Sequence, residues 1–184
     1  MRSIIELSYV IETNMPNYPI LPDVEVKRIR SIEKHGDNVT TIFFPSHGGT
    51  HVDAPIHQVD GGATLDQLPL ESFIGEAIIL NLSHKSESDD LIITLSDLRG
   101  YENKIKNGDI VVLNTGLKNQ GEFSRFGYLN TEAASWLVKK GIKLLAVDTP
   151  SVDLNVPPGE KMPVHQILLG AGIPIIEGLT NLNS

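Results

Sequence analysis

Residues 46–57 read SHGGTHVDAPIH and hold three of the six histidines of this 184-residue chain, together with one aspartate. The histidines and Asp53 all stand at odd positions, so in an extended strand, whose side chains alternate between faces, they would point the same way. The paired glycines, the β-branched residues and Pro55 each disfavour a helix here. The stretch therefore predicts an extended segment that presents several imidazoles and one carboxylate on a single face.

Imidazole nitrogen and carboxylate oxygen, without sulfur, form a ligand set that suits Zn, Mn, Fe or Co and does not choose between them. His51 and Asp53, two residues apart on one face, can bind the same ion. His47 needs a bend to join them, and the intervening glycines would supply it. His57 is either a further ligand or a free acid/base. The second role is favoured, because a catalytic site needs an open coordination position and a proton carrier.

Composition limits the classes of protein to which the chain can belong. Its apolar content of 40% and charged content of 21% predict one soluble globular domain over residues 1–184. The net charge of −8 argues against nucleic acid and anionic membranes as partners, and the absence of cysteine excludes disulfides and thiol chemistry. No signal peptide or membrane-spanning run is evident, so we expect a cytoplasmic protein.

The order of apolar runs predicts an α/β fold with a mixed sheet, few helices and an extra β-rich layer. Strand-like runs rich in Ile, Val and Leu occur at residues 3–11, 24–32, 39–45, 76–83, 109–116, 142–149 and 173–179. Helical segments are expected at residues 94–105, 130–141 and 164–172. The second of these has Asn130 or Thr131 as its cap and a terminating Gly141.

Three residues of the C-terminal half carry weaker signals. His165 begins the third expected helix. Glu177 directly follows the apolar run IPII, where it is either a strand-end residue turned to solvent or a member of a site. Asp148 follows a strand, where it either orders a turn or orients a metal ligand.

The stretch HGGTHVDAPIH matches the H-x-G-T-H-x-D-x-P-x-H signature of the cyclase family of metal-dependent hydrolases, which includes bacterial kynurenine formamidase and isatin hydrolase. The resemblance continues through LPLESFIGEAIILNLS, DIVVLNTG, WLVKKGIKLLAVDTPSVD and HQILLGAGIPIIEGLTNL. It implies a swivelling β/β/α fold. It also implies a homodimer or larger homo-oligomer, in which a neighbouring subunit can lend residues to the active site.

The resemblance also implies a role for each site residue. His47, His51 and Asp53 resemble the ligands of one metal ion. Asp53 resembles a bridge to a second ion, which His165 would bind and Glu177 would share. His57 resembles the general acid/base of the family. The implied cofactor is a divalent metal, Zn or Mn, as one or two ions.

The N-terminal region departs from the family pattern. Kynurenine formamidases resemble one another in a W-P-G-D-like stretch whose tryptophan lines the substrate pocket, whereas this chain reads PNYPILPD with Tyr18 at the corresponding place. The Tyr18 ring could stack on an aromatic substrate and its hydroxyl could donate a hydrogen bond, or it could be ordinary packing. The substrate, N-formylkynurenine included, is therefore left open.

The function that these features predict is that of a metal-dependent hydrolase of a small molecule. It would cleave an amide or formamide C–N bond, as arylformamidases do in tryptophan catabolism. The metal would lower the pKa of a water to about 7, and His57 would pass a proton to the departing nitrogen. One alternative is a hydrolase or cyclase acting on a lactone or another ring carbonyl. The other is a non-catalytic metal-binding protein whose own ligands close the site.

Overall fold

The computed structural model describes residues 4–87, 89–117, 121, 123–154, 156–157 and 159–183. A five-stranded sheet with the order β3-β9-β8-β6-β4 forms the body of this part of the chain. Four strands run parallel, and β3 pairs antiparallel with β9 at one edge. The bounds of the strands are β3 His51–Asp53, β4 Ala77–Asn81, β6 Ile110–Asn114, β8 Leu144–Val147 and β9 Ile175–Glu177. This mixed sheet confirms the predicted α/β class.

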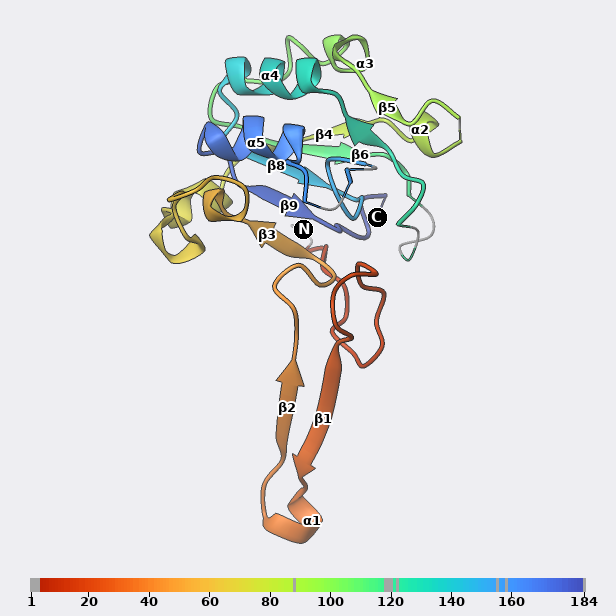
Figure 1. The fold of residues 1–184 in the computed structure, drawn as a ribbon, viewed down its shortest axis with the longest axis vertical. Coiled ribbons are helices and arrows are strands. Elements are labelled where there is room, and N and C mark those ends of the chain that lie inside the picture. Colours follow the sequence, from red (N-terminus) through yellow and green to blue (C-terminus); the bar gives the residue numbers. More distant parts are fainter. Residues whose placement is uncertain are drawn as a thin grey trace.

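Helices α4 (Thr131–Lys140) and α5 (Pro163–Gly170) lie over one face of the sheet (Figure 1). Helix α4 begins as predicted, because the Asn130 side chain accepts a hydrogen bond from the Ala133 backbone N–H. It ends at Gly141, whose left-handed backbone conformation favours glycine.

The main hydrophobic core lies between these helices and the sheet. It joins buried strand residues to buried helix residues, among them Leu80, Leu113, Leu145, Ile175, Leu137 and Leu168. The opposite face of the sheet carries a smaller cluster made of Val112, Leu144, Ala146 and Leu179, with Leu7 and Phe73 packed against it. Side chains of alternate strand residues thus enter two separate cores, as the period of a strand requires.

An antiparallel hairpin of β1 (Glu25–Arg30) and β2 (Val39–Phe43), with the short helix α1 (Ile32–His35) at its tip, projects away from the body (Figure 1). The first half of the sequence predicts an extra β-rich layer; its strands β1 and β2 form this projecting hairpin instead of a layer on the body (Figure 1). The remaining elements are short: the 3₁₀ turns η1 Pro55–His57, η2 Leu65–Gln67 and η3 Leu70–Phe73, the helices α2 His84–Glu87 and α3 Leu95–Arg99, and the parallel pair β5 Ile92–Ile93 and β7 Tyr128–Leu129.

Two local predictions are wrong. Residues 4–11 of the first expected strand form no strand, and their backbone instead bonds to loops: the Tyr9 N–H donates to Thr50 Oγ1, and Leu7 O accepts from the Thr180 N–H. The histidine segment is extended only over β3, and Pro55 then begins the 3₁₀ turn that ends at His57. Proline suits the first position of a helical turn, because its φ is already fixed and its missing N–H is not needed there.

In the part of the chain that the structure describes, no helix combines the length and the apolar character needed to cross a membrane.

Candidate metal centre

The pairing of β3 with β9 brings the first members of the site together. His51 lies directly opposite Glu177, and Asp53 lies opposite Ile175. Ile175 belongs to the core beneath the helices, so the side chains of His51, Asp53 and Glu177 lie on that same face of the sheet. Helix α5 packs on this face and supplies His165 from its first turn. The cluster therefore forms at the edge of the sheet, under the start of α5.

The two buried carboxylates each face the same two imidazoles. His165 Nε2 lies 3.3 Å from Asp53 Oδ2 and 3.2 Å from Glu177 Oε1. His51 Nε2 lies 3.6 Å from Asp53 Oδ1 and 3.5 Å from Glu177 Oε2. Ligand atoms of His51, Asp53 and Glu177 all fall within 4.8 Å of one another, which is close enough for these residues to hold metal between them.

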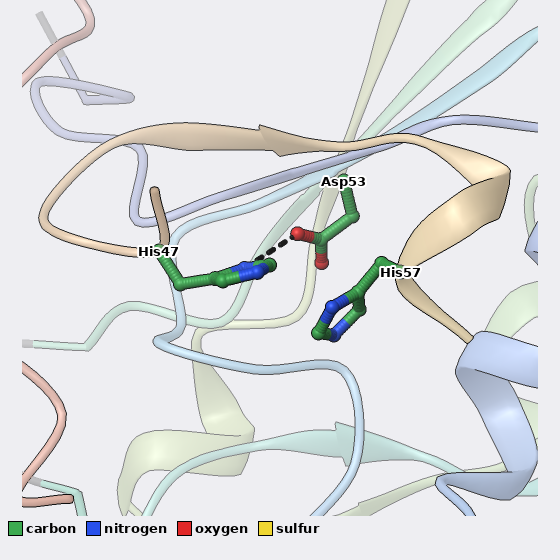
Figure 2. A group of neighbouring side chains, drawn as sticks. All are labelled: His47, Asp53 and His57. Atoms are coloured by element: carbon green, nitrogen blue, oxygen red, sulfur yellow. Dashed lines mark ion pairs between the residues drawn. The ribbon is translucent and has the colours of Figure 1, made fainter. Parts of the chain in front are cut away.

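His47 and His57 approach Asp53 from the chain segments before and after β3 (Figure 2). His47 Nδ1 lies 2.8 Å from Asp53 Oδ1. The centre of the His57 ring is 4.2 Å from that of His47 and 5.5 Å from that of His165. Ligand atoms of His47, Asp53 and His57 also lie within 4.8 Å of one another. The structure thus brings His57 close enough to be either a ligand or an acid/base.

The polar atoms of this cluster fit a cation. His51 Nε2 and both carboxylate oxygens of Asp53 are buried and make no aligned hydrogen bond, although imidazole nitrogens come close to them. A buried polar group without a partner costs about 1–3 kcal/mol, and more when it is charged. Divalent metal bound in this cluster, as one or two ions, would satisfy these atoms. The nitrogen and oxygen donors suit Zn or Mn.

Two imidazoles of the cluster, those of His51 and His165, have a contact on the ring nitrogen that does not face the two carboxylates of the cluster. His51 Nδ1 lies 3.0 Å from the backbone oxygen of Gly49, and His165 Nδ1 lies 2.7 Å from Asp153 Oδ2. Such contacts on one ring nitrogen fix the tautomer and direct the other nitrogen at a metal. Asp153 also accepts hydrogen bonds from the backbone N–H groups of Val164 and His165, at 3.1 and 3.0 Å, and so anchors the start of α5.

Asp153 is a site residue that the sequence reasoning missed. The signal was the second aspartate of VDTPSVD, whereas only the first, Asp148, was considered. Asp148 accepts hydrogen bonds from the backbone N–H groups of residues 115–117 and from the Thr115 hydroxyl, at 2.8–3.2 Å. It orders the turn that follows β6 and contacts none of the proposed metal ligands among the described residues. Of the two roles considered for Asp148, ordering a turn is the one that its contacts support.

Glu177 is buried, with 4% of its surface exposed, and it accepts a hydrogen bond from the Val152 backbone N–H at 2.9 Å. The alternative that it turns to solvent is therefore wrong. His165, at 1% exposure, is buried as well. Two of the three weaker signals of the C-terminal half, His165 and Glu177, thus belong to the same cluster as the histidine segment.

Charge in the cluster shifts several pKa values. Burial works to raise the pKa of Asp53, but contacts with His165 and His47 hold it well below its usual range. Burial works to lower the pKa of His165, but Asp153, Asp53 and Glu177 outweigh it and hold that pKa well above its ordinary value. Contact with Asp53 raises the pKa of His47. Burial lowers the pKa of His57 to about 4, so its imidazole is neutral at pH 7.

A cavity of about 260 Å³ lies beside the cluster, and the cluster residues that line it are His47, His51, His57, His165 and Glu177. The rest of its wall is largely apolar, with Tyr18, Ile20, Leu21, Pro150 and Met162, and it also includes Gln58 and Ser151. The Tyr18 ring also meets Phe123 edge to face, with ring centres 5.5 Å apart. Gln58, Met162 and Phe123 come from separate loops and carry no motif, so nothing in the sequence pointed to them.

The mixed sheet and the histidine–carboxylate cluster are those of an α/β protein with a candidate centre for a divalent metal. The Cyclase family model ("Putative cyclase") matches residues 5–154. This chain belongs to the Cyclase family, as its histidine segment indicated.

Named relatives and solved structures agree with this membership. The chain is 29% identical over 181 residues to a kynurenine formamidase of Geobacillus thermodenitrificans (strain NG80-2), covering 97% of this chain and 83% of the relative. A structure titled as a potential metal-dependent hydrolase with cyclase activity is 31% identical, with a TM-score of 0.75 and coverage of 95% and 80%. Isatin hydrolase A from Labrenzia aggregata shares the fold, with a TM-score of 0.84 at 22% identity and coverage of 97% and 81%.

Proposed function

We propose that this chain is, as a single domain, a metal-dependent hydrolase that cleaves an amide or formamide C–N bond in a small molecule. The observation that carries the proposal is the set of buried atoms without an aligned hydrogen bond, His51 Nε2 and the two oxygens of Asp53, next to an open cavity. The names of the relatives, kynurenine formamidase and isatin hydrolase, support hydrolysis at a carbon–nitrogen bond.

Five residues would hold the metal, which we propose to be Zn or Mn. His47, His51 and Asp53 would bind one ion, and His165 and Glu177 a second ion that shares Asp53. Bound there, a divalent metal polarises a carbonyl oxygen and lowers the pKa of water toward 7. Asp153 and the Gly49 carbonyl would keep the imidazoles aimed at the ions.

His57 would carry the proton of the reaction. Its ring is neutral at pH 7, because burial lowers its pKa to about 4, and it lines the cavity. A neutral imidazole can accept a proton from water and return it to the departing nitrogen, a contribution of about 10²–10⁴ in rate. The substrate would lie against Tyr18, whose ring the contact with Phe123 holds in place.

The choice of bond is tested with a panel of four substrates: formanilide, N-formylkynurenine, isatin and an aromatic lactone. Each is assayed with the Zn- or Mn-loaded protein before and after chelation. Metal-dependent hydrolysis of formanilide is the expected result. Hydrolysis of the lactone alone would favour the ring-carbonyl alternative. A tightly bound metal without turnover of any of the four would favour the non-catalytic alternative and refute the proposal.

We also propose that the chain forms a homodimer or larger homo-oligomer through the β1–β2 hairpin. Several of its apolar side chains are only half covered: Ile29, Ile32, Ile42 and Phe43 are 49–64% exposed. An isolated two-stranded hairpin is marginally stable in water, so a second copy packed against it would supply the missing apolar contacts. Light scattering should give at least twice the chain mass for the wild type. The double variant Ile42→Lys with Phe43→Ser should give the mass of one chain, and a wild-type monomer at 50 µM would refute the proposal.

A further inference from the structure

Gln58 lies next to the proposed acid/base His57 and lines the same cavity. It directly follows the 3₁₀ turn η1, and its backbone N–H and carbonyl groups are both hydrogen-bonded. The Gln58 N–H donates to the Pro55 oxygen at 3.2 Å, and the Gln58 oxygen accepts from Gln166 Nε2 at 3.4 Å. The backbone of Gln58 is therefore held beside the cavity by bonds that do not involve its side-chain amide.

The Gln58 amide group is poorly satisfied by the protein. Its Nε2 donates to Met162 Sδ at 3.4 Å, and a thioether sulfur is a weak acceptor. Its Oε1 accepts no hydrogen bond from the described residues. A half-buried carboxamide of this kind, beside an otherwise apolar wall, can offer a ligand both a donor and an acceptor.

We propose that Gln58 is a specificity-determining residue that recognises a carboxamide or lactam group carried by the substrate beside its scissile bond. A neutral group with one donor and one acceptor matches the amide of Gln58, and it would replace the weak contact with Met162. The apolar surfaces of Tyr18 and Leu21 would meanwhile hold the ring that bears this group. The inference rests on the proposed function, because it concerns the substrate of that same site.

The test uses two ring compounds of similar size: 2-aminobenzamide, which carries the carboxamide, and 2-isopropylaniline, which does not. The aromatic NMR signals of 2-aminobenzamide also show that its amide stays intact during the titration. Dissociation constants are measured by ligand-detected NMR titration of the metal-loaded protein. The wild type should bind 2-aminobenzamide about tenfold more tightly, as one or two net hydrogen bonds allow. Gln58→Met keeps the length of the side chain and should bring the two constants within twofold of each other.

Met162→Leu is the matched control, because it removes the sulfur acceptor and leaves the amide of Gln58 in place. It should keep the preference for 2-aminobenzamide. Equal binding of the two probes to the wild type, binding of neither, or an unchanged preference in Gln58→Met would overturn the inference. Since the readout is binding and not turnover, a preference that depends on Gln58 supports the inference even if formanilide is not hydrolysed, a result that would count against the proposed function alone.

Discussion

Replacing Asp153 by Asn should weaken metal binding without touching a metal ligand. Asp153 Oδ2 lies 2.7 Å from His165 Nδ1, and both groups are almost fully buried. Loss of this negative charge makes the imidazole a poorer ligand and loosens its orientation. Changes to such outer partners typically cost 10–100-fold in metal affinity, which is about 1.4–2.7 kcal/mol. Competition with a chromophoric chelator at pH 7 measures the affinity for Zn.

The same substitution has a cost in stability that can be separated from its effect on the metal. The two oxygens of Asp153 accept from the backbone N–H groups of Val164 and His165, and Asn can accept only one of these bonds. We expect the metal-free protein to lose about 1 kcal/mol of unfolding free energy, the net value of one hydrogen bond. Urea unfolding of the metal-free protein measures this loss.

Asp148→Asn is the matched control. Asp148 is as buried as Asp153, at 7% against 5% exposure, and it also accepts several hydrogen bonds, but it contacts no imidazole in the described residues. It should lose a similar stability and keep the wild-type affinity for Zn. An Asp153→Asn protein that binds Zn within twofold of the wild type would refute the orienting role. Equal weakening by both variants would refute it too, because the effect would then be general loosening of the fold.

Further predictions concern the site itself. His57→Ala should lower kcat/KM for formanilide about 10²–10⁴-fold while elemental analysis finds unchanged metal content; loss of metal would make His57 a ligand. In steady-state assays Tyr18→Ala should raise KM with little change in kcat, whereas Tyr18→Phe should stay near the wild type. An unchanged KM in Tyr18→Ala would show that Tyr18 does not contact the substrate. Zn affinity should fall as pH falls below the raised pKa of His165, by about tenfold per pH unit for each proton displaced, as chelator competition from pH 6 to 8 would show. The contribution of His165 to the stability of the metal-free protein should have the opposite pH dependence: it is present at low pH and is lost as pH rises through the raised pKa of His165. A Zn affinity that does not change with pH would contradict both predictions, because both rest on that raised pKa.

The sequence predicted the fold where local pattern and packing agree. Asn130 and Gly141 mark the ends of α4, and the apolar runs of β6 and β8 are buried in the sheet on both faces. The run at residues 3–11 misled, because apolar content alone does not provide a neighbouring strand. Pro55 was interpreted as a helix breaker, yet it is equally suited to begin a turn, which is how His57 reaches the cluster.

The site was predictable to the extent that its residues lie close together in the chain. His47, His51 and Asp53 could be grouped from spacing alone, whereas His165 and Glu177 were grouped with them only through family resemblance. The structure shows why these distant residues meet: β9 pairs with β3, and α5 brings His165 against Asp53 on β3 and Glu177 on β9. Residues such as Asp153, Gln58 and Phe123 act through contacts between distant loops, and no local pattern encodes those contacts.

The central claim is that this cluster binds divalent metal, and the most direct test is the metal content of the protein purified without added metal or chelator. Elemental analysis should find one or two equivalents of Zn or Mn in the wild type and almost none in Asp53→Ala. Formanilide hydrolysis by the wild type should disappear on chelation and return when the metal is restored. A wild-type protein that is metal-free and stays so after incubation with Zn and Mn would contradict the account.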